Sequence, residues 1–231
     1  MASKQPVRVL TTAAHVDFEP TSVTIAIGSG DKTKTFSADK SLLSNSSESF
    51  SRALKKEWKE GEENLVTLPE DDPEIFALYL QAVYHAIIPT MRTQNAQEED
   101  SCCQVAREEY EKLCDLYVLV EKLQDNNVKN LVIVALSEAL RTVRLDGSRY
   151  VPDAKAVASA YDGTPEGSPL RAFLRDCWVY EAAWDYTSEP HLFPQSFLYD
   201  VAVAMAELRT LPATSPPQNP DNYIGTAVEK E

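Results

Sequence analysis

The sequence predicts an α+β fold in which a small, mostly N-terminal sheet is covered by helical hairpins. Strand-like patterns occur only within residues 1–70, whereas the later apolar residues recur at helical spacing. A run of strands followed by a run of helices is typical of the α+β class. The chain has 231 residues, which is enough for one core and an additional helical unit.

A β-hairpin is predicted close to the N-terminus. Val23–Ile27 alternates apolar and polar residues, Gly28–Asp31 supplies a turn, and Lys34–Phe36 is the returning strand. No helix and no third glycine follow these glycines, so a turn explains them better than a phosphate-binding loop does. Before the hairpin, Val7–Leu10 is a weaker strand candidate within an N-terminal arm, residues 1–20.

Two helices are predicted to follow the hairpin. Asp39 or Ser37 can cap the first helix, which a break at Ser44–Ser47 separates from the second. The second helix carries apolar residues at helical spacing as far as Trp58. Gly61 is expected to end it, because glycine is favoured just beyond the last helical turn.

A third strand and an acidic turn lead into a longer helix. Leu65–Leu68 is a short apolar strand, and Pro69 ends it. Asp72 can accept hydrogen bonds from the amides at a helix start, and Pro73 suits the first helical position. This motif contains no nucleophile, phosphate loop or metal cluster, which favours a packing and binding role.

The rest of the chain is predicted to be helical up to a disordered tail. Residues 91–107 are polar and acidic and are expected to form a mobile connector, although Glu98–Glu111 could join the next helix. Tyr110–Leu123 and Val128–Leu140 are amphipathic, and the short break between them predicts antiparallel neighbours. Residues 146–210 form a helical extension, and the proline-rich residues 211–231 are expected to be disordered.

Within the extension, two helix starts are predicted. Ser168 is expected to cap a helix that begins with Pro169, and Pro194 opens the last helix. The predicted buried side of that last helix consists of Phe197, Leu198, Val201, Ala202, Met205 and Leu208.

Charge and hydropathy exclude two classes of partner. The chain has 36 acidic and 22 basic residues, a formal net charge of −14, so it should repel phosphate backbones and bind no nucleic acid. No apolar run approaches the ~20 residues that span a bilayer, which predicts no membrane contact. With no signal-peptide pattern, a cytoplasmic or nuclear protein is expected.

The cysteines and histidines do not indicate a cofactor, a metal or a catalytic centre. Cys102 and Cys103 are adjacent, too close for a two-cysteine zinc clip, while Cys114 and Cys177 lie among apolar residues. The three histidines share no motif. Serines, histidines and aspartates are present, but no serine occupies a Gly-x-Ser-x-Gly elbow, so no enzyme is predicted.

These motifs together resemble a BTB/POZ domain, specifically the stand-alone type abundant in fungi, over residues 21–145. The residues that carry the resemblance are Val23–Gly28, Thr35–Phe36, Lys40–Leu43, Ser49–Phe50, Leu65–Phe76, Val83–Tyr84, Leu116–Asp125 and Lys129–Leu131. Thr164–Arg171 is similar to the helical extension behind many fungal members. Two positions depart from the family: Ser22 and Asp39 replace the usual Asp and His, while Lys40 keeps the basic residue of a charged pocket.

The resemblance implies a protein–protein interaction adaptor or scaffold. Members that are substrate adaptors of cullin-based ubiquitin ligases carry a hydrophobic residue, any residue and a glutamate after the third helix. Trp58-Lys59-Glu60 matches this pattern, eight residues beyond Phe50. The partner-contacting residues implied are Phe50, Leu54, Trp58 and Glu60. The alternative for this motif is that Trp58 packs against its own core and Glu60 is merely solvated.

A second function implied by the resemblance is plain homo-oligomerisation, in transcription or signalling, with no ubiquitin role. Val7–Leu10 could pair across a homodimer as an exchanged strand. The interface residues implied are Val7, Val9, Leu10, Leu42 and Leu43. A detached relative of the channel tetramerisation domains, which share a related fold, is a further alternative.

Overall fold

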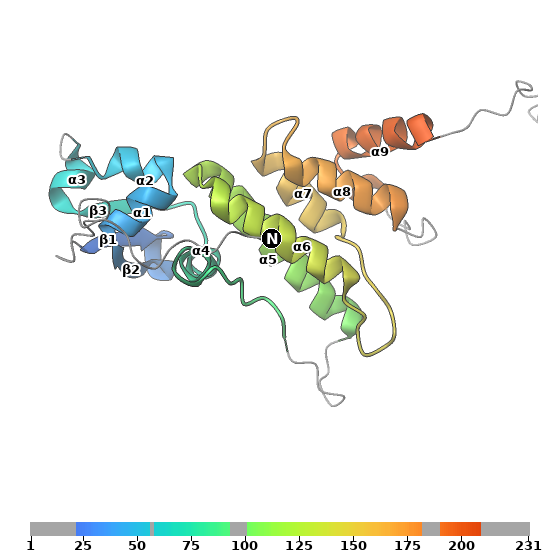
Figure 1. Ribbon diagram of the computed structural model, residues 1–231, viewed down its shortest axis with the longest axis horizontal. Coiled ribbons are helices and arrows are strands. Elements are labelled where there is room, and N and C mark those ends of the chain that lie inside the picture. The colour runs from blue at the N-terminus through green and yellow to red at the C-terminus, as the bar shows by residue number, and fades with distance from the viewer. Residues whose placement is uncertain (1–21, 56–57, 93–100, 182–189, 209–231) are drawn as a thin grey trace, which may run out of the picture.

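The computed structural model describes residues 22–55, 58–92, 101–181 and 190–208, with strands first and helices after them (Figure 1). The predicted α+β fold class is confirmed. The elements are β1 Ser22–Ile27, the 3₁₀ turn η1 Gly30–Lys32, β2 Lys34–Asp39, α1 Lys40–Ser46, α2 Glu48–Ala53, α3 Lys59–Glu63, β3 Leu65–Leu68, α4 Pro73–His85, α5 Cys102–Leu123, α6 Asn126–Arg141, α7 Ala154–Gly163, α8 Pro169–Tyr180, the 3₁₀ turn η3 Pro190–Leu192 and α9 Gln195–Leu208.

The sheet has three strands in the order β2-β1-β3. β1 and β2 form the predicted antiparallel hairpin, with Ser22 opposite Asp39 and Ile27 opposite Lys34. β3 lies parallel to β1 on its other side. The alternation in β1 has the expected consequence, since Val23, Ile25 and Ile27 are fully buried and the residues between them are partly exposed.

Side-chain caps set the helix starts in the first half of the chain. Asp39 Oδ1 accepts a hydrogen bond from the Leu42 amide at 2.7 Å, at the start of α1. Asp72 Oδ1 accepts from the Glu74 amide at 2.6 Å, with Pro73 as the first residue of α4. Both starts were predicted, because aspartate before an apolar run satisfies amides that the helix leaves open.

An aromatic cluster joins the sheet half to the long helices. Phe76 and Tyr79 of α4 lie 5.7 Å apart between ring centroids, and Phe50 of α2 stacks on Tyr79 at 6.4 Å. The Tyr79 hydroxyl donates to Asp125, which caps α6. Burial raises the pKa of both groups, and for Tyr79 the neighbouring Asp125 carboxylate raises it further.

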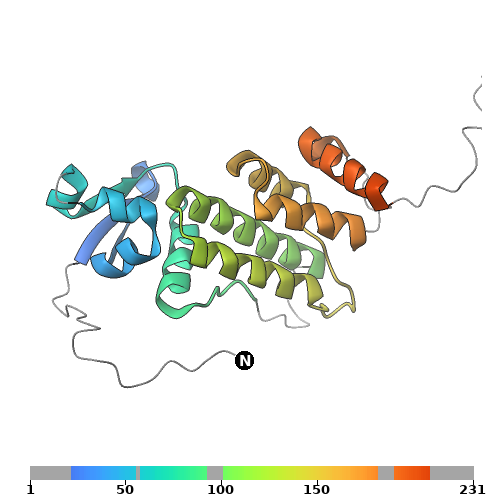
Figure 2. The ribbon, with the colours of Figure 1, turned by 45° about the horizontal axis from the view of Figure 1, so that its top comes forward.

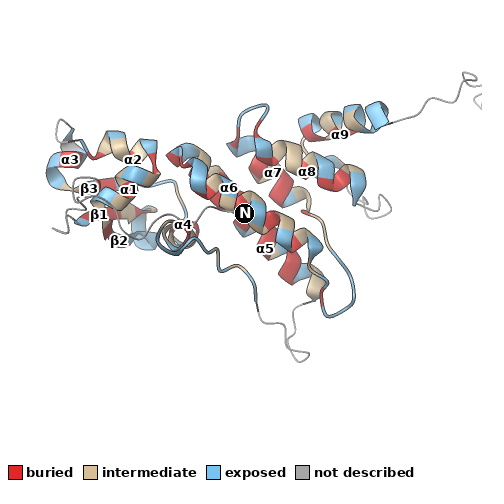
Figure 3. Ribbon diagram, in the orientation of Figure 1, coloured by how far each residue is buried: buried red, intermediate tan, exposed pale blue. Residues whose placement is uncertain are grey.

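The long helix α5 occupies the centre of the molecule. It packs against α4, α6 and α7, and its buried positions face more than one neighbour (Figure 3). The sheet with α1–α3 lies at one end of the molecule and α7–α9 at the other, with α5 and α6 between them (Figures 1 and 2). α5 and α6 form the predicted antiparallel pair.

The last part of the predicted connector over residues 91–107 belongs to α5, as the alternative for Glu98–Glu111 allowed. α5 begins at Cys102, where the Ser101 hydroxyl accepts from the Gln104 amide. Val105 and Ala106 are already buried, so this first turn belongs to the core despite the polar residues around it. Residues 93–100 lie outside the described residues, as do the predicted N-terminal arm and C-terminal tail.

The extension departs from expectation in two details. Ser168 precedes Pro169 at the start of α8 as predicted, but its hydroxyl does not cap the helix. In α9, Phe197 and Val201 are buried, whereas Ala202, Met205 and Leu208 of the predicted buried side are exposed. The aromatic contacts of Phe197 with Trp178 and Phe193 anchor the N-terminal half of the helix, and the exposed residues follow further along it.

Replacing Ser47 by alanine should destabilise the fold. Its buried hydroxyl accepts from the Phe50 amide at 3.1 Å and donates to the Leu123 carbonyl at 2.5 Å, joining α2 to the end of α5. Losing both bonds in a buried setting should lower the free energy of unfolding by about 1–3 kcal/mol. Urea titration followed by circular dichroism measures this loss.

Ser29→Ala is the matched control for that experiment. Ser29 is an exposed cap residue of η1 whose side chain makes no capping bond, so the change should leave the unfolding midpoint nearly unaltered. Equal effects of Ser47→Ala and Ser29→Ala would contradict the role given to the Ser47 hydroxyl.

Candidate interaction surface

The predicted partner-contacting residues lie in α2, in α3 and in the segment between these two helices. α2 ends at Ala53, and both Phe50 and Leu54 are almost fully buried. Their assignment as contact residues is therefore corrected: they pack in the core beside the segment, and a partner cannot touch them while the core is closed.

Trp58 and Glu60 lie on the surface instead. Trp58 precedes α3 as its cap residue and is 59% exposed, and Glu60 in the first turn is also exposed. The Trp58 amide donates to the Lys55 carbonyl at 3.0 Å, and the Trp58 carbonyl accepts from the Gly61 amide at 3.0 Å. The second bond closes a turn at the start of α3, and Trp58 and Glu60 both belong to that turn.

Gly61 was predicted to end the second helix, but in the structure it has a different role. It lies inside α3, and the end cap is Asn64 in the left-handed conformation, with φ 49°. A Cβ atom on Gly61 would lie 1.9 Å from the Lys55 carbonyl oxygen, which no side chain could tolerate without a backbone shift. Glycine is therefore required here by the close approach of two backbone segments.

Asp39 stands beside Lys40, the basic residue that the resemblance places in a charged pocket, and each of the two bonds to another part of the chain. The Asp39 carboxylate caps α1, and its own amide donates to the Tyr84 hydroxyl oxygen at 2.7 Å. The Lys40 ammonium donates to Asn64 Oδ1 at 2.9 Å, which directs it towards the end of α3. Sequence reasoning missed Tyr84 as a partner of Asp39 because 45 residues separate the two.

The residues predicted for a dimer interface fall into three groups. Leu43 is fully buried in the chain's own core, which corrects its assignment to an interface. Leu42 is half-buried on α1 and stays a prediction. Val7, Val9 and Leu10 lie outside the described residues.

Comparison with models of protein families matches residues 18–101 to the BTB/POZ domain. The chain contains a BTB/POZ domain. Such domains are protein-interaction domains that mediate contacts between proteins and oligomerisation. A comparison with curated proteins finds no match to this chain.

The match to the BTB/POZ family includes the sheet, α1 to α4 and the cap of α5. α5 and α6 continue the same core beyond residue 101, so the predicted boundary at residue 145 stays a prediction. The surface of Trp58 and Glu60 lies within the matched part.

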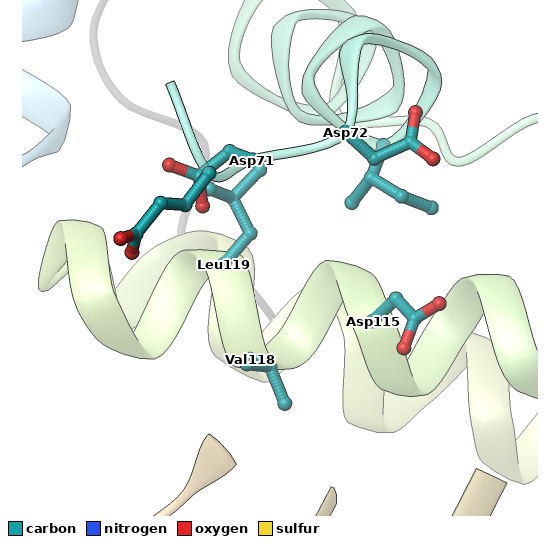
Figure 4. A pocket seen from close by; sticks show the side chains of 7 residues that line it. Asp71, Asp72, Asp115, Val118 and Leu119 are labelled. Carbon is teal, nitrogen blue, oxygen red and sulfur yellow. The ribbon is translucent and has the colours of Figure 1, made fainter. Parts of the chain in front are cut away.

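A shallow acidic hollow of about 170 Å³ lies between the turn before α4 and the face of α5 (Figure 4). Its lining residues are Glu70, Asp71, Asp72, Ile75, Asp115, Val118 and Leu119. Three of its carboxylates have partners within the chain: Asp71 pairs with Lys122 at 2.7 Å, Asp72 caps α4, and Asp115 accepts from Ser159. These bonds hold the turn before α4 and the helix α7 to α5 and cap the start of α4.

Metal binding and membrane insertion find no support in the described part of the chain. Among those residues, no three histidine, cysteine or acidic side chains come close enough together to hold a metal ion. None of the described helices combines the length and the apolar character that crossing a bilayer requires.

The four thiols should divide into two pairs by reactivity. Cys102 and Cys103 are partly exposed, whereas Cys114 and Cys177 are buried. Burial raises the pKa of the Cys177 thiol to about 12 and raises that of Cys114 as well, so little reactive thiolate forms at pH 8. Ellman's reagent should titrate two thiols rapidly in the native protein and four after unfolding in guanidinium. Rapid titration of all four in the native state would contradict the buried placement.

Proposed function

We propose that this chain is an adaptor that binds the N-terminal domain of a cullin through a surface centred on Trp58 and Glu60. The observation that carries the proposal is the exposure of Trp58, beside the buried Phe50 and Leu54. The alternative interpretation, in which Trp58 packs against its own core, requires a buried tryptophan and does not agree with this exposure.

An exposed tryptophan has the properties of an interface anchor. Its side chain can bury ~150–250 Å² on contact, and tryptophan is enriched among residues whose truncation costs binding energy. A partner with an apolar pocket would remove the indole from water without opening the core of the BTB domain.

Glu60 supplies direction to the same surface. Its carboxylate lies in the first turn of α3, close enough to Trp58 in the chain to contact the same partner. A carboxylate at the edge of an apolar contact orients the partner by pairing with lysine or arginine. The net charge of −14 would also steer a basic partner surface towards this chain.

The helices after residue 146 could add a second contact to such an adaptor. α9 carries exposed apolar side chains, including Val203, Met205 and Leu208, on the part of the helix beyond the buried Phe197 and Val201. These residues are separate in sequence from Trp58, so substitutions at the two places can be tested independently.

Trp58→Ala should weaken capture of a purified cullin N-terminal domain, and Trp58→Ala with Glu60→Ala should abolish it. We expect the single change to lower affinity at least about 30-fold, or roughly 2 kcal/mol, because the main apolar anchor is removed. Isothermal titration calorimetry measures the affinity, and Glu62→Ala, an exposed glutamate on the same helix, is the matched control. Absence of binding by the unmutated chain at micromolar concentrations would refute the cullin role.

Self-association is measured in the same samples. Sedimentation equilibrium of the chain alone gives its oligomeric state, and the complex gives the number of chains per cullin. A chain that forms dimers but binds no cullin would favour the plain oligomerisation module over the adaptor.

A further inference from the structure

Lys40 connects the start of α1 to the far end of the turn that carries Trp58. Its ammonium donates to Asn64 Oδ1 at 2.9 Å and approaches the Gly61 carbonyl oxygen at 3.4 Å. The Lys40 side chain is half-buried, so this contact is partly shielded from water. Both acceptors follow Trp58 in the chain, on or just after α3.

α3 needs such tertiary contacts because it is very short. Five residues cannot form a stable helix alone, since nucleation fixes several residues for the first hydrogen bond. The Asn64 carbonyl accepts from the Thr24 amide at 2.9 Å, which ties the backbone end of the turn to β1. The Lys40 bond ties the Asn64 side chain to α1 as well.

The ammonium also suits this end of the helix electrostatically. Carbonyls in the last turn of a helix carry a partial negative charge and attract a cation. Lys40 lies beside such a carbonyl, that of Gly61, within the last turn of α3. A lysine in this place therefore stabilises both the helix end and its left-handed cap.

We propose that Lys40 is a positioning residue that fixes the orientation of Trp58 and Glu60 through Asn64 and Gly61. The importance of that orientation for binding rests on the proposed adaptor function. The contact between Lys40 and Asn64 is a property of the chain alone, so it can be tested with or without a cullin.

Four variants separate this role from a general loss of stability. Lys40→Met keeps the aliphatic stem and removes the donors, whereas Lys40→Arg keeps donors and charge. Asn64→Gly removes the acceptor and still permits the left-handed backbone at φ 49°. Lys34→Met, an exposed lysine on β2, is the matched control.

Fluorine NMR of protein labelled with 5-fluorotryptophan reports on Trp58 directly. The chain has three tryptophans, and the Trp58 signal is the one missing from a Trp58→Phe sample. Lys40→Met and Asn64→Gly should each shift or broaden the Trp58 signal and leave the signal of the buried Trp178 in place. Lys40→Arg should give the same Trp58 signal as the native chain, and Lys34→Met should not change that signal. An unchanged Trp58 signal in both Lys40→Met and Asn64→Gly overturns the proposal, and if Lys40→Met fails to fold, Asn64→Gly decides.

Binding then tests the consequence. Lys40→Met and Asn64→Gly should each lower cullin affinity about tenfold, and the double variant should lose little more, because both changes break one contact. Native affinity in Lys40→Met overturns the positioning role, as does full additivity in the double variant. If the unmutated chain binds no cullin, the adaptor function fails, while the fluorine signals still decide whether Lys40 orients Trp58.

Discussion

The structure depends on the burial of α5, a helix that is covered on several sides at once. α4 and α6 pack against it, and α7 packs against it from the extension. Two polar bonds also join α5 to the extension: the Tyr110 hydroxyl donates to the Tyr150 carbonyl, and Lys155 pairs with Glu111 at 2.6 Å. A helix with one free face would expose several large apolar side chains to water. The extension therefore completes the core of α5, which explains why the two helical units share one continuous set of buried residues.

A buried ion pair and a neighbouring hydrogen bond join two segments to this helix. Glu109 of α5 pairs with Arg144, from the loop after α6, and both side chains are buried. Glu109 also accepts from Thr90, in the segment after α4, at 3.2 Å. Removing one partner of a buried pair typically costs 3–5 kcal/mol, because the other charge stays in a poorly solvating environment. The pair therefore restricts how the segments on either side of α5 and α6 can move.

Much of this fold could be predicted from local sequence patterns. The hairpin, the third strand and the Asp72-Pro73 helix start follow from alternation and capping, which act between close neighbours in the chain. The burial of the first turn of α5 could not, because Val105 and Ala106 are surrounded by polar residues and their neighbours are distant in sequence. Apolar spacing also did not distinguish the helix faces that the chain buries in its own core from those that it leaves exposed. Leu43 was expected at an interface and is core, whereas Leu208 was expected in the core and is exposed. Periodicity identifies a face, but only tertiary packing determines what lies against it.

The same limit explains how the candidate surface arises. Trp58 follows Leu54 by four residues, so an unbroken helix would place it one turn further along the buried face. The helix instead ends at Ala53, and the Gly61 backbone of the next helix lies close to Lys55. Trp58 is exposed, unlike Phe50 and Leu54. Glycine at position 61 permits the close backbone approach and Asn64 ends α3 in the left-handed conformation, so these structural residues differ from those that would contact a partner. The spacing motif identifies the contact residues, but it does not reveal the backbone geometry that makes them accessible.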